Sequence, residues 1–283
     1  MLKRDCDALR AAGVRTTSIG RSVLGRDIPA LFIGREGGAS VIVTAAIHAR
    51  ESLTARLVMR QAEHLRRSKL FGGGIWFVPM VNPDGCLFAA RGMGAFDGLP
   101  PTAFARERAL MSALSIDTPP ALFKSNIRGV DLNVNFAAGW GRGARNVRAA
   151  GAENYIGPHP FSEPETRALR AFTQAVAPLA TLSYHAKGRE LYWYFGQDPA
   201  AAARDRRIAH TLNKRLGYRL VDGDMASAGG YKDWCIAALK IPAFTVEIID
   251  DARPHPLRDG DLKPDIARNL ELPRILLREA TRA

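Results

Sequence analysis

Nearly continuous apolar runs constrain the fold of this chain more than any other feature of its sequence. They are rich in β-branched residues, and Gly, Pro, Asn or Asp often marks their ends. They lie at residues 28–34, 40–48, 73–85, 179–185 and 242–249. Runs of this kind are typical of strands that neighbouring layers bury on both faces.

Segments with helical periodicity lie between these predicted strands. Leu53, Leu57, Val58 and Leu65 recur at helical spacing in the segment from Ser52 to about Arg67. Further helices are expected at 162–176, opened by a Ser162–Glu165 capping box, at 203–217, ended by Gly217, and at 267–282. The Gly- and Pro-rich stretch 86–130 is expected to be a long, functional loop. Strands that alternate with helices predict an α/β sheet covered on both faces.

The length of the chain predicts one domain over residues 1–283. It has 283 residues, 47% of them hydrophobic, with no visible repeat or linker. Its three cysteines form no CxxC pair, which argues against a disulfide framework or a thiolate metal site. The first residues lack the apolar core of a signal peptide, and no apolar run approaches the roughly 18 residues of a membrane span. We therefore expect a cytoplasmic protein without a membrane partner.

The charge balance is strongly basic, with 40 Lys and Arg against 28 Asp and Glu, a formal charge of +12. Such a chain attracts anionic partners, for example an acidic peptide, a cell-wall polymer or a nucleic acid. The densest basic groups, at 64–69 and 204–210, are typical of solvated helix faces. No basic stripe is interleaved with aromatic residues, so we expect no nucleic-acid partner. A nucleic-acid-binding module stays a minor alternative.

Polar side chains occupy the ends of three predicted strands. His48 and Glu51 follow the run 40–48, His185 ends another run, and Glu247 lies inside "TVEII". Ligands of open α/β sheets bind beyond the carboxyl ends of the strands. Two His and one carboxylate are a typical Zn²⁺ ligand set that leaves a position for water, and a second carboxylate can act as a general base.

Each of these residues also has an ordinary structural explanation. HxxE alone is a weak pattern that fits a polar helix start, and a single His such as His185 is more often a hydrogen-bonded core or loop residue. Glu247 is harder to dismiss, because a carboxylate buried without a partner is costly. Together these residues make a metal hydrolase plausible, but their spacing alone does not establish one.

Several motifs, in order along residues 16–250, resemble the zinc metallocarboxypeptidases of the carboxypeptidase A-like family. They are "HARE" at 48–51, "NPDG" at 82–85, "RGVDLNVNF" at 128–136, "SEPET" at 162–166, "SYH" at 183–185 and "TVEI" at 245–248. The resemblance implies a single α/β/α domain with a central mixed, mostly eight-stranded sheet, and one Zn²⁺ per chain. It implies that His48, Glu51 and His185 are the metal ligands, that Glu247 is the general base, and that Tyr231 is a mobile substrate-binding tyrosine.

Two positions depart from the digestive enzymes of this family. Lys124 stands where the resemblance places the Arg that stabilises the oxyanion, and a Lys can do this as a point charge. Val134 stands where an Arg would grip the terminal carboxylate of the substrate, although Asn133, the other carboxylate-binding position, is present. An ordinary exopeptidase is therefore the less favoured interpretation.

The same segments resemble the bacterial γ-D-glutamyl-meso-diaminopimelate peptidases, which act on peptidoglycan stem peptides. The similar stretches are "FKSNIRGVDLN", "AENYIGPHPFSEPET", "HAKGRELYW" and "GGYKDW". This resemblance implies a peptidase for small acidic peptides, with Arg128 as a candidate contact for a substrate carboxylate. The alternatives are a metallocarboxypeptidase for ordinary peptide C-termini and a catalytically silent protein that binds cell-wall fragments.

Overall fold

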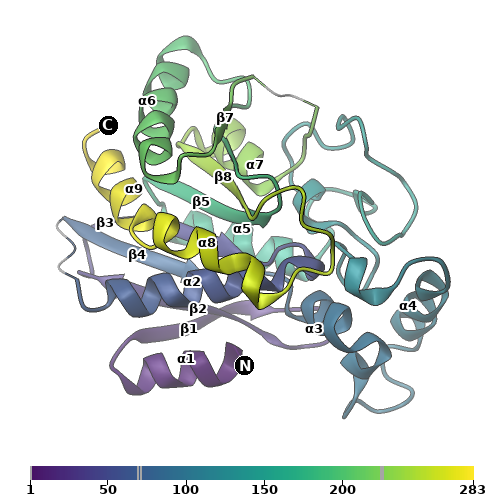
Figure 1. Ribbon diagram of the computed structural model, residues 1–283. Helices are drawn as coiled ribbons and strands as arrows, with labels where there is room; N and C mark the ends of the chain where they lie inside the picture. The colour runs from purple at the N-terminus through teal and green to yellow at the C-terminus, as the bar shows by residue number, and fades with distance from the viewer. Residues whose placement is uncertain (1, 69, 71, 224–225) are drawn as a thin grey trace.

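A mixed sheet lies at the centre of the computed structural model, which describes residues 2–68, 70, 72–223 and 226–283 (Figure 1). In this described part, the sheet has eight strands in the order β1-β2-β4-β3-β5-β8-β6-β7. The strands are β1 Arg15–Arg21, β2 Asp27–Gly34, β3 Ala39–Ala45, β4 Gly73–Val78, β5 Ala180–Ala186, β6 Glu190–Tyr192, β7 Arg219–Val221 and β8 Ala243–Ile248. The predicted mixed, eight-stranded sheet is confirmed.

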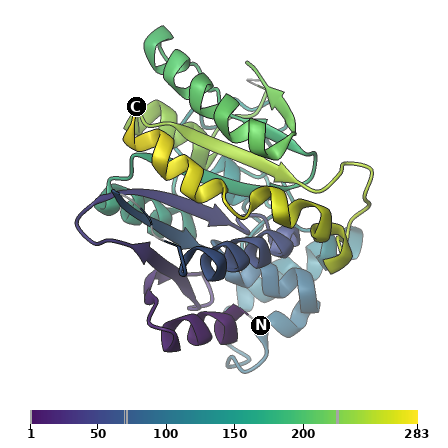
Figure 2. The ribbon, with the colours of Figure 1, turned by 60° about the vertical axis from the view of Figure 1, so that its left-hand side comes forward.

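Helices cover both faces of this sheet (Figures 1 and 2). One face carries α1 Leu2–Ala11, α2 Ser52–Leu65, α6 Pro199–Leu216, α8 Asp259–Asn269 and α9 Leu272–Thr281. The other face carries α5 Pro164–Val176 and α7 Tyr231–Leu239. None of the helices in the described residues is both long and apolar enough to cross a lipid bilayer.

The central strands are mostly apolar because both of their faces are covered, and two of their buried polar side chains pair with each other, Thr44 of β3 with Ser183 of β5 at 3.0 Å. Val41 and Val43 of β3 pack into the core beneath α2 and α9, whereas Ile42, between them, packs into the core beneath α5 and α7. All three side chains are fully buried. The pleat of a strand sends alternate side chains to opposite faces, so a strand covered on both faces has few positions for polar side chains.

The stretch 86–130 is more helical than predicted. It contains most of α3 Pro83–Arg91, as well as α4 Ala105–Asp117 and the short 3-10 helices Gly92–Phe96 and Pro120–Leu122. The "NPDG" motif at 82–85 forms the start of α3, where the Asn82 side chain caps the helix by accepting a hydrogen bond from Gly85 N at 3.0 Å. Pro83 supports this start, since proline fits the first turn of a helix.

Two other predicted helix boundaries were wrong. Helix α5 begins at Pro164 with Glu163 as its N-cap, and the Ser162 hydroxyl donates to Glu163 Oε1 instead of forming the expected capping box. The expected C-terminal helix is two helices, α8 and α9, separated at Leu270–Glu271. The predicted end of α6 is confirmed, because Gly217 follows it in the left-handed conformation, at a φ of 64°.

Candidate metal centre

The three predicted ligands converge at the carboxyl ends of β3 and β5. His48 follows β3, Glu51 lies in the 3-10 helix Ala49–Glu51, and His185 lies in β5, which pairs in parallel with β3. One ligand atom from each residue lies within 4.8 Å of the other two. The sheet thus brings together residues that are far apart in the sequence.

The donor set of this cluster fits a metal ion. His48 Nδ1 lies 2.8 Å from Glu51 Oε1, and His185 Nδ1 lies 3.2 Å from His48 Nδ1 and 3.3 Å from Glu51 Oε2. Two imidazole nitrogens that face each other at this distance need a shared proton or a cation between them. Two nitrogens and one carboxylate in a buried pocket are ligands of the kind that zinc takes in catalytic sites.

Asp131 orients His48 from behind, and the sequence analysis did not single it out. Its Oδ1 lies 3.3 Å from His48 Nε2, and its two oxygens accept hydrogen bonds from the backbone N–H groups of Asn133 and Asn154. Burial lowers the pKa of His48, but Glu51 and Asp131 outweigh it and raise that pKa to about 10. A carboxylate that holds the second nitrogen of a ligating His is a common feature of metal sites.

Glu247 faces the ligands because of strand register. In the parallel pair β5–β8, Glu247 lies directly beside His185, so both side chains are on the same face of the sheet. Glu247 Oε2 is buried and has no hydrogen-bond partner among the described residues. Burial raises the pKa of Glu247 to about 8, and the charge of Glu51 acts in the same direction. The carboxylate is thus free to exchange a proton at the centre.

Lys124 is attached to the ligand loop through its backbone. Ala49 N donates to Lys124 O at 2.9 Å, and Arg50 N donates to Phe123 O at 2.8 Å. The Lys124 charge acts against the burial that raises the pKa of Glu247, and it adds to the effect of His48 in lowering the pKa of Asp131. A cation in this position can stabilise negative charge that develops on a bound carbonyl group.

Asn133 lies in the 3-10 helix Leu132–Val134 and contacts the first residue of α7. Its Oδ1 accepts a hydrogen bond from Tyr231 N at 3.3 Å, so its Nδ2 group is the part left to meet a substrate. Val134 is buried, which agrees with its having no role in gripping a carboxylate.

The structure places the Tyr231 side chain in the core, and its expected role as a mobile substrate-binding residue stays a prediction. Its side chain is 1% exposed and packs with Phe136 and Trp234 beneath the sheet. Its hydroxyl shares a hydrogen bond of 2.8 Å with Thr173 of α5. The residues that precede it, 223–230, include positions 224 and 225, which lie outside the described residues.

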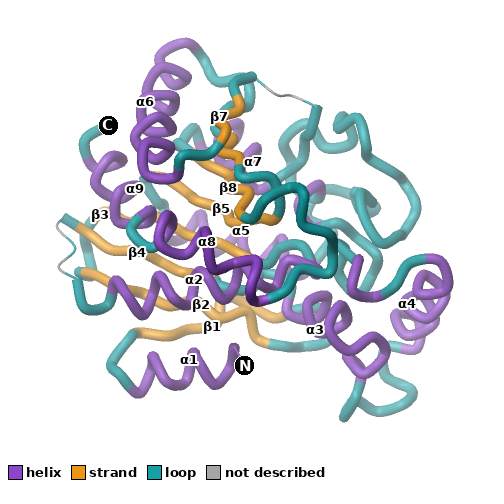
Figure 3. The backbone as a smooth tube through the Cα atoms, viewed as in Figure 1, coloured by secondary structure: helices purple, strands orange, loops and turns teal. Residues whose placement is uncertain are grey.

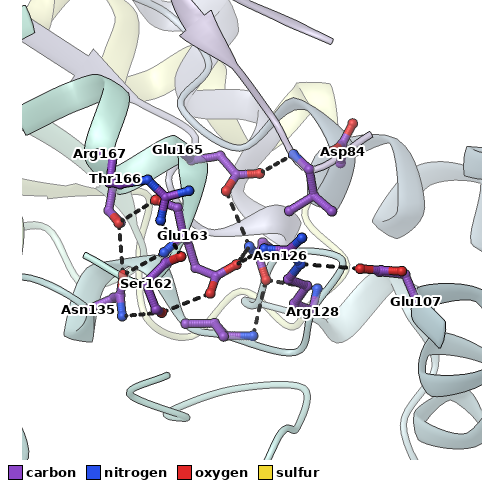
Figure 4. Close-up of polar contacts among 12 residues, drawn as sticks. Asp84, Glu107, Asn126, Arg128, Asn135, Ser162, Glu163, Glu165, Thr166 and Arg167 are labelled. Carbon is purple, nitrogen blue, oxygen red and sulfur yellow. Dashed lines mark hydrogen bonds and ion pairs between the residues drawn. The ribbon is translucent and has the colours of Figure 1, made fainter. Parts of the chain in front are cut away.

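Arg128 lies beside a buried polar network that connects the loops (Figure 4). Its guanidinium group is 3.3 Å from Glu107 and 3.9 Å from Glu163. In this network, Asn126 Nδ2 donates to Glu163 at 2.8 Å and to Glu165 at 3.3 Å. These acidic partners give Arg128 a structural contact, and its expected contact with a substrate carboxylate stays a prediction.

The fold and the site together define a metallohydrolase, with a ligand triad and a free carboxylate at the ends of parallel strands. The chain belongs to the zinc carboxypeptidase family, whose model matches residues 6–271, and it is a zinc metallopeptidase.

Relatives within this family include enzymes with peptidoglycan-related names. The chain is 30% identical over 278 residues to gamma-D-glutamyl-L-diamino acid endopeptidase 1 of Lysinibacillus sphaericus, covering 92% of this chain and 67% of that protein. It is 28% identical over 250 residues to murein peptide amidase A of Escherichia coli K12, covering 82% and 80%. The expected bacterial branch of the family is confirmed.

Solved structures agree with the fold. Bovine thrombin-activatable fibrinolysis inhibitor, in complex with tick carboxypeptidase inhibitor, has a TM-score of 0.72 at 17% identity, covering 99% of this chain and 94% of that one. Murein-tripeptide amidase of Escherichia coli O157 has a TM-score of 0.59 at 23% identity, covering 92% and 91%.

Proposed function

We propose that this protein is a zinc-dependent peptidase that hydrolyses the γ-D-glutamyl-diaminopimelate bond of peptidoglycan stem peptides. The observation that carries the chemistry is the buried Oε2 of Glu247, which lies beside His185 and has no hydrogen-bond partner in the described part of the chain. His48, Glu51 and His185 would hold one zinc ion. A zinc ion held by such ligands lowers the pKa of water to about 7 and polarises a carbonyl group.

Four residues around the ligands would then each assist the reaction or the binding of its substrate. Glu247 accepts a proton from the attacking water and later donates it to the leaving amine. Lys124 stabilises the negative charge that develops on the carbonyl oxygen. Asp131 keeps the His48 ring in the orientation that presents Nδ1 to the metal. Asn133 would contact a carboxylate of the substrate through its Nδ2 group.

The choice of substrate rests on the named relatives and on charge. One relative is named for gamma-D-glutamyl-L-diamino acid bonds and another for murein peptides. A small peptide with several carboxylates suits a chain with a formal charge of +12. Val134, in place of a carboxylate-gripping Arg, disfavours the alternative of an ordinary metallocarboxypeptidase.

The test is hydrolysis of L-Ala-γ-D-Glu-meso-diaminopimelate by the zinc-loaded protein, beside a blocked dipeptide with a free C-terminus. We expect one zinc per chain and release of diaminopimelate that a chelator abolishes. Cleavage of the dipeptide alone would favour the ordinary carboxypeptidase. Cleavage of neither peptide by a zinc-loaded chain would reject the proposed function.

A further inference from the structure

Glu153 lies between two cations at the edge of the metal centre. Its Oε2 is 3.4 Å from Lys124 Nζ and 3.8 Å from Arg50 Nη1. The side chains of both cations are 20% exposed, whereas that of Glu153 is 47% exposed. One carboxylate oxygen of Glu153 therefore forms ion pairs with two cations, Lys124, which the proposed reaction uses, and Arg50.

The backbone on both sides of Glu153 is tied to the centre. Ala152 O accepts hydrogen bonds from Lys124 N at 2.8 Å and from Ser125 N at 3.0 Å. On the other side, Asn154 N donates to Asp131 Oδ2 at 3.1 Å, and Asp131 holds His48. Glu153 is therefore not an ordinary surface glutamate, because both of its neighbours are fixed relative to the ligands.

Arg50 fixes the carboxylate from the opposite side. Its Nη1 donates to Leu122 O at 3.1 Å, and its backbone N donates to Phe123 O at 2.8 Å. Since both its guanidinium group and its backbone are anchored, Arg50 is a stationary charge. It holds the Glu153 carboxylate, and the carboxylate in turn faces the more flexible Lys124.

Lys124 is the residue that needs such support. A lysine ammonium group is a point charge on a flexible four-carbon stem, without the planar fork of arginine. Within the part of the chain that the structure describes, Glu153 is the one ion-pair partner of Nζ, which makes no hydrogen bond there. At 3.4 Å this contact is longer than a typical charge-assisted hydrogen bond, so it orients Nζ and leaves its donors free for a substrate.

We propose that Glu153 is a positioning residue that holds the Lys124 ammonium group toward the metal centre. The proposal rests on the role of Lys124 in the proposed function and deepens it. Glu153 limits the conformations of the Lys124 side chain, so that less conformational entropy is lost when the transition state forms. The anchored pair Arg50–Glu153 thus supplies part of the rigidity that an arginine at position 124 would carry in its own side chain.

The kinetic test compares zinc-loaded Glu153→Gln with the wild-type chain on the tripeptide. We expect kcat to fall about threefold to tenfold, while KM stays within about twofold, because a partly exposed ion pair has a modest effect. The double variant Glu153→Gln, Lys124→Ala should have the same kcat as Lys124→Ala alone. Asp251→Asn is the matched control, since Asp251 is an exposed carboxylate paired with Lys187 at 2.7 Å, and its kcat should not change.

A second readout does not depend on activity. The side-chain order parameter of Lys124 Cε, measured by NMR and assigned with Lys124→Arg, should fall in Glu153→Gln and stay unchanged in Asp251→Asn. An unchanged order parameter would overturn the proposal, and so would additive effects in the double variant. If the wild-type chain cleaves neither peptide, the proposed function fails, and the order parameter still decides whether Glu153 holds Lys124.

Discussion

The two sides of the candidate site are built in different ways. The metal-binding side is attached to the sheet: His48 follows β3, His185 lies in the adjacent parallel strand β5, and Glu247 lies in β8. The substrate-facing side carries Lys124, Asn133 and their neighbours on residues 118–163, which contain neither a strand of the sheet nor an α-helix (Figure 3). The strands position the first set of residues, which we call the sheet-attached side. Hydrogen bonds between loops position the second set, which we call the loop side.

This difference decides how each side tolerates change. A residue in register on a sheet keeps its place as long as the strands pair. The loops instead depend on buried polar groups, among which Asn126 contacts two glutamates and Asn135 binds Ser162 and Thr166 (Figure 4). We therefore expect variants of the sheet-attached side to affect chemistry alone, and variants of the loop side to affect both chemistry and stability.

The largest effect is expected at Glu247. Glu247→Gln removes the proposed base and should lower kcat by about 10²–10⁴-fold, while zinc content stays at one per chain, because Glu247 is not among the ligands. Metal analysis and turnover of the tripeptide check this. Glu190→Gln is the control, since Glu190 lies beside Glu247 on β6, and its kcat should change far less. Near-native turnover of Glu247→Gln would remove Glu247 from the reaction.

Lys124→Ala tests the loop side and should lower kcat by about 10²–10³-fold, the usual cost of losing one group that stabilises an oxyanion. Lys124→Arg should recover much of this loss, because it keeps the charge. Zinc content should be unchanged in both variants. Equal kcat values for Lys124→Ala and the wild type would show that the sheet-attached side suffices for the chemistry.

Asp131 connects the two sides, since it lies on the loop side and holds a ligand of the other. Asp131→Asn should lower zinc affinity by about 10–100-fold, as is typical when the partner of a ligating His is changed. Competition with a chromogenic chelator measures this affinity. Asp205→Asn, at an equally buried aspartate on α6, should leave zinc affinity as it is. Unchanged affinity in Asp131→Asn would mean that the sheet alone orients His48.

The sequence predicted the sheet-attached side well for a physical reason. Apolar runs buried on both faces mark central strands, and parallel strands present their carboxyl ends at one edge, so His48, His185 and Glu247 could be placed together before the structure was known. Lys124 and Asn133 could be placed only through resemblance. Asp131 was inside a quoted motif, but nothing in its local pattern shows that its side chain turns toward His48.

Tyr231 and Arg128 show why the loop side is harder to predict. The role of Tyr231 was predicted from a motif. In the structure, its ring packs into the core beneath α5 and α7, and this packing sets the direction of the side chain at the start of α7. Arg128 depends on Glu107 and Glu163, which lie 21 and 35 positions away in the sequence, in α4 and directly before α5. No spacing rule predicts such long-range polar contacts.

Glu165 gives the loop side a pH dependence. Burial raises the pKa of Glu165 from 4.5 to about 8, so its neutral form is favoured in the folded protein. Its contribution to stability is fully present below about pH 4.5 and is lost as pH rises toward 8. We therefore expect Glu165→Gln to gain stability relative to the wild type between pH 5 and pH 8, measured as urea midpoints. A pH-independent difference would show that Glu165 is ionised in the folded chain.

The smallest kinetic effect is expected at Tyr231. Tyr231→Phe removes the hydrogen bond to Thr173 and should lower the free energy of unfolding by about 1 kcal/mol. Because the hydroxyl is buried beneath the sheet, kcat and KM for the tripeptide should both stay within about twofold of wild type. Thr173→Val should likewise leave kcat and KM unchanged, but it should lower the free energy of unfolding further, because it leaves the Tyr231 hydroxyl unpaired and removes the hydrogen bond from Thr173 to Leu169 O. A tenfold rise in KM in Tyr231→Phe alone would mean that Tyr231 leaves the core to meet the substrate, and that the loop side rearranges during the reaction.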